Sequence, residues 1–349
     1  MKALNLHGVN DLRFEDVALP ERKSDEVTLR IMAAGICGSD IPRIFTKGTY
    51  HFPTIPGHEF SGVITDADDN SLISGRVVVF PLIPCETCEY CQVGNYELCN
   101  HYDYYGSRRD GGYAEYLNVK IRNLVWIPSN VTYEEAAMCE PASVALHALR
   151  QGKVKAMDTV AIWGIGPIGL LLAKWATAMG AKQVILVARN NMKKEAAEKM
   201  GFRHAINSKV TDPINYINGL TDGHGADICV EGTGNSDALA YCLKTCRKMG
   251  TVVCMGNPLG NMSLNQDTYW AILRKQLHLV GTWNSSFTEL HNDWKDTLSA
   301  MSDKKIDVTP LITQKYALRE FKKAFNDILN PDIYTCKVMF INKGEDKTR

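Results

Sequence analysis

The sequence has no net charge, no long apolar run and no leader-like start. Its 349 residues include 39 lysines and arginines and 39 aspartates and glutamates, so no net field attracts nucleic acid or an anionic membrane. No apolar run approaches the roughly 20 residues that a membrane span requires, and residues 1–5 do not resemble a signal peptide. These absences predict a cytoplasmic protein without nucleic-acid or membrane partners.

A chain of this length is too long for one ordinary core, so two domains are expected. Up to about residue 125, short alternating apolar segments such as 27–31 and 76–80 lie between Gly and Pro turns, which predicts a β-barrel-like domain. From about 158 to 281, buried strands alternate with helices, and this pattern predicts a parallel sheet covered on both faces. The expected strands of this sheet are 159–163, 184–188, 228–231, 251–255 and 277–281, with a weaker one near 205–206.

The last part of the chain, beyond residue 282, has no core of its own. A helix is expected over 318–329 and a final strand over 337–341, and both are expected to return to the first domain. The predicted domain limits are therefore 1–149 with 282–349 for the β-barrel domain and 150–281 for an inserted α/β domain.

The α/β region contains the glycine pattern G-x-G-x-x-G. The pattern follows the predicted strand and opens a helix expected over 167–179, which is the setting in which it binds a dinucleotide. There the first glycine permits a tight turn, the second admits a pyrophosphate, the third allows helix–sheet packing, and the helix N-terminus supplies amide donors. A purely structural turn is the alternative. The predicted cofactor residues are Gly164, Gly166, Pro167, Ile168 and Gly169.

The second strand of such a domain usually ends near an acidic residue that binds the ribose hydroxyl. Here Arg189 follows that strand, with Lys193 and Lys194 on the next helix. A planar guanidinium can pair with a 2′-phosphate, so the sequence favours NADP, or use of both NADP and NAD. In the alternative interpretation, Arg189 stacks on adenine and NAD binds without the acid.

Four cysteines, Cys85, Cys88, Cys91 and Cys99, follow one another as Cys-x2-Cys-x2-Cys-x7-Cys. Four thiolates so close in sequence can enclose one zinc ion without leaving an open coordination position, so this zinc would be structural. A disulfide framework is disfavoured by the odd total of 11 cysteines. An iron–sulfur cluster is disfavoured by the spacing. The bacterial iron–sulfur motif has three residues before its last cysteine and a proline after it, whereas here seven residues precede Cys99 and Asn100 follows it.

A second set of metal-binding residue types lies in the first domain at Cys37, His58, Glu59 and Glu140. A thiolate, an imidazole and carboxylates suit zinc, and an open fourth position would admit a substrate alcohol. Asp40 is a candidate acceptor for the second nitrogen of His58. Taken singly, each residue has an ordinary structural explanation, and their occurrence together with a cofactor fold favours the metal site.

The sequence resembles the zinc-containing medium-chain alcohol and sorbitol dehydrogenases along its whole length. The residues that carry the resemblance are 37–40, 57–59, the four-cysteine lobe, 110–116, 140–141 with 147–148, and the glycine pattern. Within that family it is most similar to polyol-phosphate dehydrogenases of the galactitol-1-phosphate 5-dehydrogenase type, through the stretches 37–45 and 106–112. The resemblance implies a GroES-like catalytic domain, a Rossmann domain and a homodimer or homotetramer.

The resemblance also implies the roles of the site residues. Cys37, His58 and Glu59 would bind the catalytic zinc, and Glu140 would bind directly or through water. Ser39 would hydrogen-bond the substrate hydroxyl and pass its proton outward. Many relatives continue this relay with a histidine three residues later, but here the residue is Pro42, which leaves water as the exit route. Manganese or cobalt are alternative metals for a site with so many carboxylates.

Three arginines in loops of the metal-bearing domain, Arg43, Arg108 and Arg109, are candidate ligands for a substrate phosphate, because a guanidinium can clamp phosphate with two hydrogen bonds. The alternative is that they are solvated surface charges. The sequence therefore predicts hydride transfer between NAD(P) and a secondary alcohol of a polyol phosphate, such as galactitol 1-phosphate or arabitol phosphate. The alternatives are a plain polyol or threonine-type dehydrogenase, and a catalytically idle relative that acts as a binding protein.

Overall fold

The computed structural model describes residues 1–258 and 260–342, and the chain forms two compact units. Among the described residues, the first unit comprises Met1–Glu140, Ser286–Lys304 and residues 308–342, and the second comprises Pro141–Ser285 and Lys305–Asp307. The domain limits 1–149 with 282–349 and 150–281 stay a prediction, and their last residues lie outside the described part. No helix among the described residues is long and apolar enough to cross a membrane.

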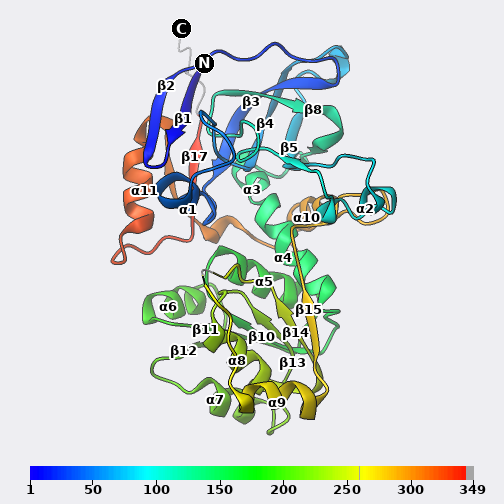
Figure 1. Cartoon of the computed structure of the whole chain (residues 1–349), viewed down its shortest axis with the longest axis vertical. Coiled ribbons are helices and arrows are strands. Elements are labelled where there is room, and N and C mark those ends of the chain that lie inside the picture. The colour runs from blue at the N-terminus through cyan, green and yellow to red at the C-terminus, as the bar shows by residue number, and fades with distance from the viewer. Residues whose placement is uncertain (259, 343–349) are drawn as a thin grey trace. The chain divides into compact units, whose positions relative to one another are not determined.

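The first unit is built on a mostly antiparallel sheet in the order β16-β17-β3-β4-β5-β9, with β8 also paired to β3. The last strand, β17, pairs antiparallel with β3, so the C-terminal segment completes this sheet (Figure 1). The strands are β3 (Glu26–Gly35), β4 (Glu59–Asp66), β5 (Arg76–Val79), β8 (Tyr116–Lys120), β9 (Leu124–Trp126), β16 (Ile312–Tyr316) and β17 (Lys337–Ile341). Two small sheets accompany it, β1 (Lys2–Gly8) with β2 (Asp11–Asp16) and β6 (Leu82–Ile83) with β7 (Asp103–Tyr104).

Helices of the first unit are short. The helix expected over 318–329 starts as a 3-10 turn at Leu318–Glu320 and continues as α11. Its apolar residues Phe321, Ala324 and Phe325 belong to the core under the sheet, which explains why this tail needs no core of its own. The helices are α1 (Asp40–Pro42), α2 (Glu89–Gln92), α3 (Tyr133–Ala137), α10 (Asp293–Ser302) and α11 (Phe321–Leu329), and α4 (Cys139–Gln151) spans the boundary between the units.

The second unit is a six-stranded parallel sheet in the order β12-β11-β10-β13-β14-β15, which is the Rossmann order 3-2-1-4-5-6. All six predicted strands are present, as β10 (Thr159–Trp163), β11 (Gln183–Ala188), β12 (His204–Asn207), β13 (Ala226–Glu231), β14 (Cys246–Cys254) and β15 (His278–Gly281). The fifth begins earlier than expected, at Cys246, because this residue pairs with Ala226 across a bulge.

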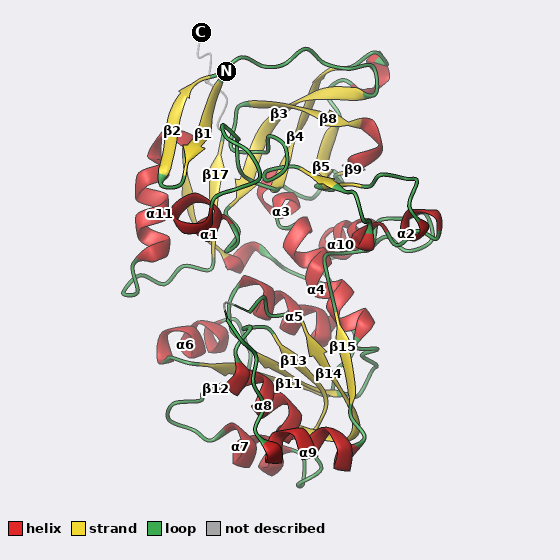
Figure 2. Ribbon diagram, viewed as in Figure 1, coloured by secondary structure: helices red, strands yellow, loops and turns green. Residues whose placement is uncertain are grey.

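Helices cover this parallel sheet (Figure 2). The side chains of α7 and α8 pack with Ala161 and Trp163 in one apolar cluster, while α5 and α6 pack against β11 and β12. The helices are α5 (Pro167–Ala178), α6 (Asn191–Lys199), α7 (Pro213–Leu220), α8 (Ser236–Thr245) and α9 (Gln266–Lys275). The fold therefore places the glycine pattern at the carboxyl end of β10, where parallel sheets bind ligands.

Candidate functional site

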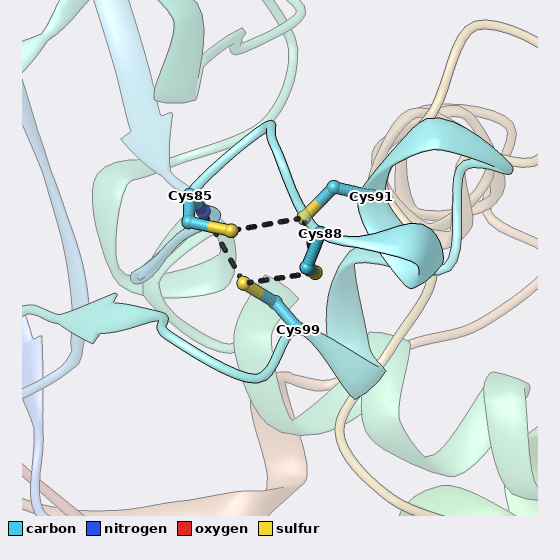
Figure 3. Close-up of side chains that lie close together, drawn as sticks. All are labelled: Cys85, Cys88, Cys91 and Cys99. Atoms are coloured by element: carbon cyan, nitrogen blue, oxygen red, sulfur yellow. Dashed lines mark hydrogen bonds between the residues drawn. The ribbon is translucent and has the colours of Figure 1, made fainter.

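Four cysteine thiols converge in a lobe of the first unit (Figure 3). The Sγ atom of Cys88 lies 3.5 Å from that of Cys91 and 4.0 Å from that of Cys99, and Cys85 and Cys91 are 3.9 Å apart. Sulfurs bound to one zinc ion at about 2.3 Å lie about 3.8 Å from one another, whereas a disulfide needs about 2.05 Å. All four are free thiols, so this geometry fits a structural zinc ion.

Local backbone structure brings these cysteines together. Cys88 is the N-cap of the one-turn helix α2, which carries Cys91, and the 3-10 turn Tyr96–Leu98 ends at Cys99. The amide of Cys85 donates a hydrogen bond to the Cys99 sulfur at 3.2 Å. The cage is thus formed from one short segment, which explains why the metal site could be predicted from the spacing of its cysteines.

A second cluster combines a thiol, an imidazole and a carboxylate from neighbouring strands. Cys37 follows β3, His58 directly precedes β4, and Glu59 is its first residue. One ligand atom from each of these three residues lies within 4.8 Å of the other two. Sulfur, nitrogen and oxygen donors together suit zinc. The structure therefore brings together three of the four residues predicted to hold the catalytic metal.

The antiparallel pairing of β3 with β4 sets this geometry. Gly35 lies opposite Glu59 in the ladder, and a Cβ atom at Gly35 would lie 2.3 Å from Glu59 Oε2. Only glycine leaves room for the carboxylate at that point. The chain then turns after β3, so that Cys37 comes within reach of the same carboxylate.

Asp40 anchors the loop that carries Cys37. Its carboxylate, which is fully buried, accepts hydrogen bonds from the Tyr113 hydroxyl at 2.6 Å and the Arg43 guanidinium at 2.6 Å. It also accepts the amide of Cys37 at 3.1 Å. His58 Nδ1 is 3.8 Å from Asp40 Oδ1, which is too long for a hydrogen bond, so the expected acceptor role of Asp40 toward His58 is not observed.

The His58 ring and the Cys37 thiol both fit a bound cation. His58 Nδ1 is buried and has no hydrogen-bond partner among the described residues. Burial and the adjacent Glu59 carboxylate raise the pKa of Cys37 to about 11, partly offset by the Lys337 ammonium. A metal ion favours the thiolate that this environment otherwise disfavours.

Lys337, which sequence reasoning missed, is a buried partner of Glu59. Its Nζ donates to Glu59 Oε1 at 2.7 Å and to Oε2 at 2.5 Å, and both side chains are at most 2% exposed. The pKa of Lys337 is raised, because the attraction of Glu59 and Cys37 outweighs the opposing effect of burial. The ammonium cancels one negative charge of the cluster and holds the Glu59 carboxylate beside the thiol.

Glu140 lies outside the three-residue group in the part of the chain that is described. It is linked to the group through Tyr104, whose hydroxyl donates to Glu140 Oε1 at 3.4 Å and whose ring packs edge-on against His58. Burial raises the pKa of Glu140 to about 8, against the opposing effect of His58. A cation nearby would favour the carboxylate form, so the role of Glu140 as a further ligand stays a prediction.

Ser39 is exposed beside the cluster, at the N-terminus of α1. Ser39 is among the groups that act to lower the pKa of the Cys37 thiol, so its hydroxyl lies near that sulfur, and it is open to water. Pro42, at the other end of α1, has no group that could carry a proton. The position of Ser39 thus supports direct release of a proton to solvent.

The dinucleotide glycines have the steric surroundings that their predicted roles require. Gly164 follows β10 with φ of +102°, in the region that favours glycine, and a Cβ at Gly169 would lie 1.8 Å from Gly164 O. Gly166 has open space where a Cβ would lie. Pro167 and Ile168 form the first turn of α5, which begins there. The loop therefore leaves room for a ligand at the N-terminus of α5.

A pocket of about 320 Å³ adjoins this loop, and it is large enough for the adenosine part of a dinucleotide. Arg189, Lys193 and Lys209 line it, together with the acidic Asp237. Lys194 instead pairs with Glu198 at 2.7 Å and does not line the pocket. Lys209 was not found from the sequence, because it follows β12, a strand that the sequence signals only weakly.

The three candidate phosphate arginines differ in their partners. Arg43 binds Asp40, and Arg109 binds Asp103 at 2.6 Å. The guanidinium of Arg108 lies over two tyrosine rings, 4.2 Å from the centroid of Tyr50 and 4.4 Å from that of Tyr102. Among the described residues Arg108 has no carboxylate partner, and its Nε is buried without an acceptor.

A row of aromatic rings connects Arg108 with the metal-binding cluster. Tyr102 contacts Tyr104 with 6.2 Å between ring centroids, and Tyr104 contacts His58 at 5.8 Å. One end of this row is the imidazole of the candidate metal cluster, and the other is a guanidinium for which no described residue supplies a counter-charge. Such a row could hold a substrate with a hydroxyl at one end and an anion at the other.

Two family models match the chain. One, described as the alcohol dehydrogenase GroES-like domain, matches residues 23–129, and the other, described as zinc-binding dehydrogenase, matches residues 167–303. Galactitol 1-phosphate 5-dehydrogenase of Escherichia coli K12 is 33% identical over 92% of this chain and 95% of its own length. Sorbitol dehydrogenase of Bacillus subtilis is 31% identical over 97% and 96%, and D-arabitol-phosphate dehydrogenase of Enterococcus avium is 30% identical over 97% and 96%.

Solved structures agree with these matches. Galactitol-1-phosphate dehydrogenase from Escherichia coli superposes with a TM-score of 0.92 at 32% identity, covering 98% of this chain and all of the other. A zinc-binding dehydrogenase from Sinorhizobium meliloti, bound to NADP, gives 0.89 at 28% identity over 98% and 99%. An alcohol dehydrogenase from Escherichia coli CFT073, complexed with NADH, gives 0.89 at 25% identity over the same shares.

Proposed function

We propose that this chain, which belongs to the zinc-dependent medium-chain dehydrogenase family, oxidises a secondary alcohol of a polyol phosphate to the ketose phosphate. NADP or NAD would accept the hydride. The observation that carries the proposal is the aromatic row from His58 to Arg108. Two of the relatives named above act on phosphorylated polyols by their names, and both family domains that this activity needs are present.

The residues of the first unit have distinct tasks in this reaction. A zinc ion held by Cys37, His58 and Glu59 would polarise the substrate hydroxyl as a Lewis acid. Ser39 would accept a hydrogen bond from that hydroxyl and pass the proton to solvent. Lys337 keeps the Glu59 carboxylate in place, and Tyr104 separates Glu140 from the imidazole. The protein thus contributes orientation and electrostatics.

Arg108 is the arginine best prepared for the substrate phosphate. Tyr50 and Tyr102 both contact its planar group, so little side-chain entropy is lost when a phosphate binds. Arg43 and Arg109 already neutralise Asp40 and Asp103. They would contribute to phosphate binding mainly through their remaining N–H groups.

Substituting Arg108 by methionine tests the phosphate assignment, because methionine keeps an unbranched apolar side chain and loses the charge. We expect kcat/KM for galactitol 1-phosphate or arabitol phosphate to fall about 10- to 100-fold, the effect of losing charge-assisted hydrogen bonds. The change should be mainly in KM, and turnover of sorbitol or threonine should be unchanged. Arg109→Met is the matched control, with a smaller loss. Equal turnover of phosphorylated and plain polyols by the wild type would refute the assignment and favour a sorbitol-type or threonine-type activity.

For the cofactor, we propose a preference for NADP, supported by Arg189, Lys193 and Lys209 in the nucleotide pocket. Arg189→Asp should lower kcat/KM with NADP at least about tenfold relative to that with NAD, because a carboxylate repels a 2′-phosphate and suits a ribose hydroxyl. Lys194→Asp is the control, since Lys194 pairs with Glu198 outside the pocket. An equal effect of Arg189→Asp on both cofactors would contradict the preference.

We also propose that the protein is a homodimer or homotetramer. β15 is the outermost strand of the second unit's sheet, and Leu279 on it is 43% exposed. Trp283, just beyond the strand, is 57% exposed. An unpaired strand edge with apolar side chains beside it supports association with another copy of the chain.

A further inference from the structure

Trp163 occupies an unusual place for a tryptophan, at the end of the first strand of the parallel sheet. It pairs in register with Val187 on one side and Glu231 on the other, and it directly precedes Gly164 of the glycine pattern. The side chain is 3% exposed, yet it lines the nucleotide pocket. Trp163 is therefore a buried residue in the wall of the nucleotide pocket.

The indole N–H of Trp163 has no acceptor. Nε1 is buried, and no described residue accepts a hydrogen bond from it. Trp175 in the same unit shows the usual arrangement, because its Nε1 donates to the carbonyl oxygen of Ala142 at 2.9 Å. Buried polar groups are nearly always hydrogen-bonded, and an unpaired donor beside a pocket is a donor that a ligand can satisfy.

The chemistry of the pocket varies along its wall. Arg189, Lys193 and Lys209 supply cationic groups suited to a ribose phosphate, while Trp163 and Ala238 supply an apolar wall suited to a flat base. Adenine carries ring nitrogens that accept hydrogen bonds in its plane. We infer that the Trp163 indole N–H donates to a ring nitrogen of the cofactor's adenine. This inference rests on the proposed use of NAD(P) and adds the residue that recognises its base.

Trp163→Phe is the direct test, because phenylalanine keeps an aromatic ring and removes the N–H. Calorimetric titration of the zinc-loaded protein with NADP should show about tenfold weaker binding, the effect of losing one hydrogen bond from a desolvated donor. Without nucleotide, the thermal unfolding midpoint should fall less than that of the control variant below, because both substitutions remove ring volume from a buried side chain but this one breaks no hydrogen bond within the protein.

Trp175→Phe is the matched control, since it removes an indole N–H that has an acceptor within the protein. It should lower the unfolding midpoint by about 2–4 °C more than Trp163→Phe does and leave NADP binding unchanged. The two variants should therefore show opposite patterns: Trp163→Phe weakens NADP binding and has the smaller effect on stability, and Trp175→Phe has the larger effect on stability and leaves binding unchanged.

Nucleotides in which one adenine ring nitrogen is replaced by carbon identify the acceptor. With one of these deaza analogues, wild type and Trp163→Phe should bind equally well, and the other analogues should preserve the difference. The inference is overturned if Trp163→Phe binds NADP as tightly as the wild type, or if it loses stability as Trp175→Phe does. A wild-type protein that binds no adenine nucleotide would instead refute the proposed cofactor.

Discussion

Replacing Cys37 with serine is expected to reduce kcat for polyol oxidation by about a thousandfold or more. Lewis-acid polarisation of the substrate hydroxyl stabilises the transition state by several kcal/mol, and each 1.4 kcal/mol changes the rate by about a factor of ten. A serine hydroxyl is a poor zinc ligand compared with a thiolate, so His58 and Glu59 alone would hold the ion weakly. Steady-state kinetics with galactitol 1-phosphate measure the loss of kcat, and elemental analysis measures the loss of zinc.

The zinc content of the Cys37→Ser variant distinguishes the two proposed metal sites. Cys37→Ser should lose one zinc ion and keep the other, because Cys85, Cys88, Cys91 and Cys99 form their own cage. Cys254→Ser serves as the control, since Cys254 is a half-buried free thiol outside both clusters, and it should keep both ions and full activity. Retention of activity and of both ions by Cys37→Ser would contradict the assignment of the catalytic site.

The parts of the molecule that were predictable from the sequence depend on local patterns. The four-cysteine cage comes from 15 consecutive residues, 85–99, and the glycine pattern lies between a strand and a helix that adjoin it in sequence. The return of the last strand to the first domain was predictable for a different reason. A single apolar strand such as 337–341 cannot bury its side chains alone, so it must join an existing sheet.

The remainder of the site depends on register between distant strands. Glu59 and Lys337 are separated by 278 residues, and they meet because β4 and β17 both pair with β3 near Gly35. A lysine at the start of an apolar strand usually lies in solvent, so its sequence position gave only a weak signal. Asp40 was misjudged for a similar reason, because its partners Tyr113 and Arg43 and its distance from His58 follow from tertiary packing.

The buried Glu59–Lys337 pair leads to the largest expected effect on stability. Lys337→Met should lower the free energy of unfolding by about 3–5 kcal/mol, because it leaves the Glu59 carboxylate buried without its counter-charge. The lower end of that range applies to the zinc-loaded protein, in which the ion also faces the carboxylate. Urea unfolding followed by circular dichroism gives the free energies for both variant and wild type.

Lys2 provides a matched control, because its Nζ is 2.6 Å from Asp16 in an ion pair whose side chains are 45% and 74% exposed. Lys2→Met should change the free energy of unfolding by less than about 1 kcal/mol, as exposed pairs do. If Lys337→Met were as mild as Lys2→Met in the metal-free protein, Glu59 would have to be neutral or solvated in the folded protein. In that case Glu59 could not act as a charged ligand, and the proposed three-residue metal site would lose its oxygen donor.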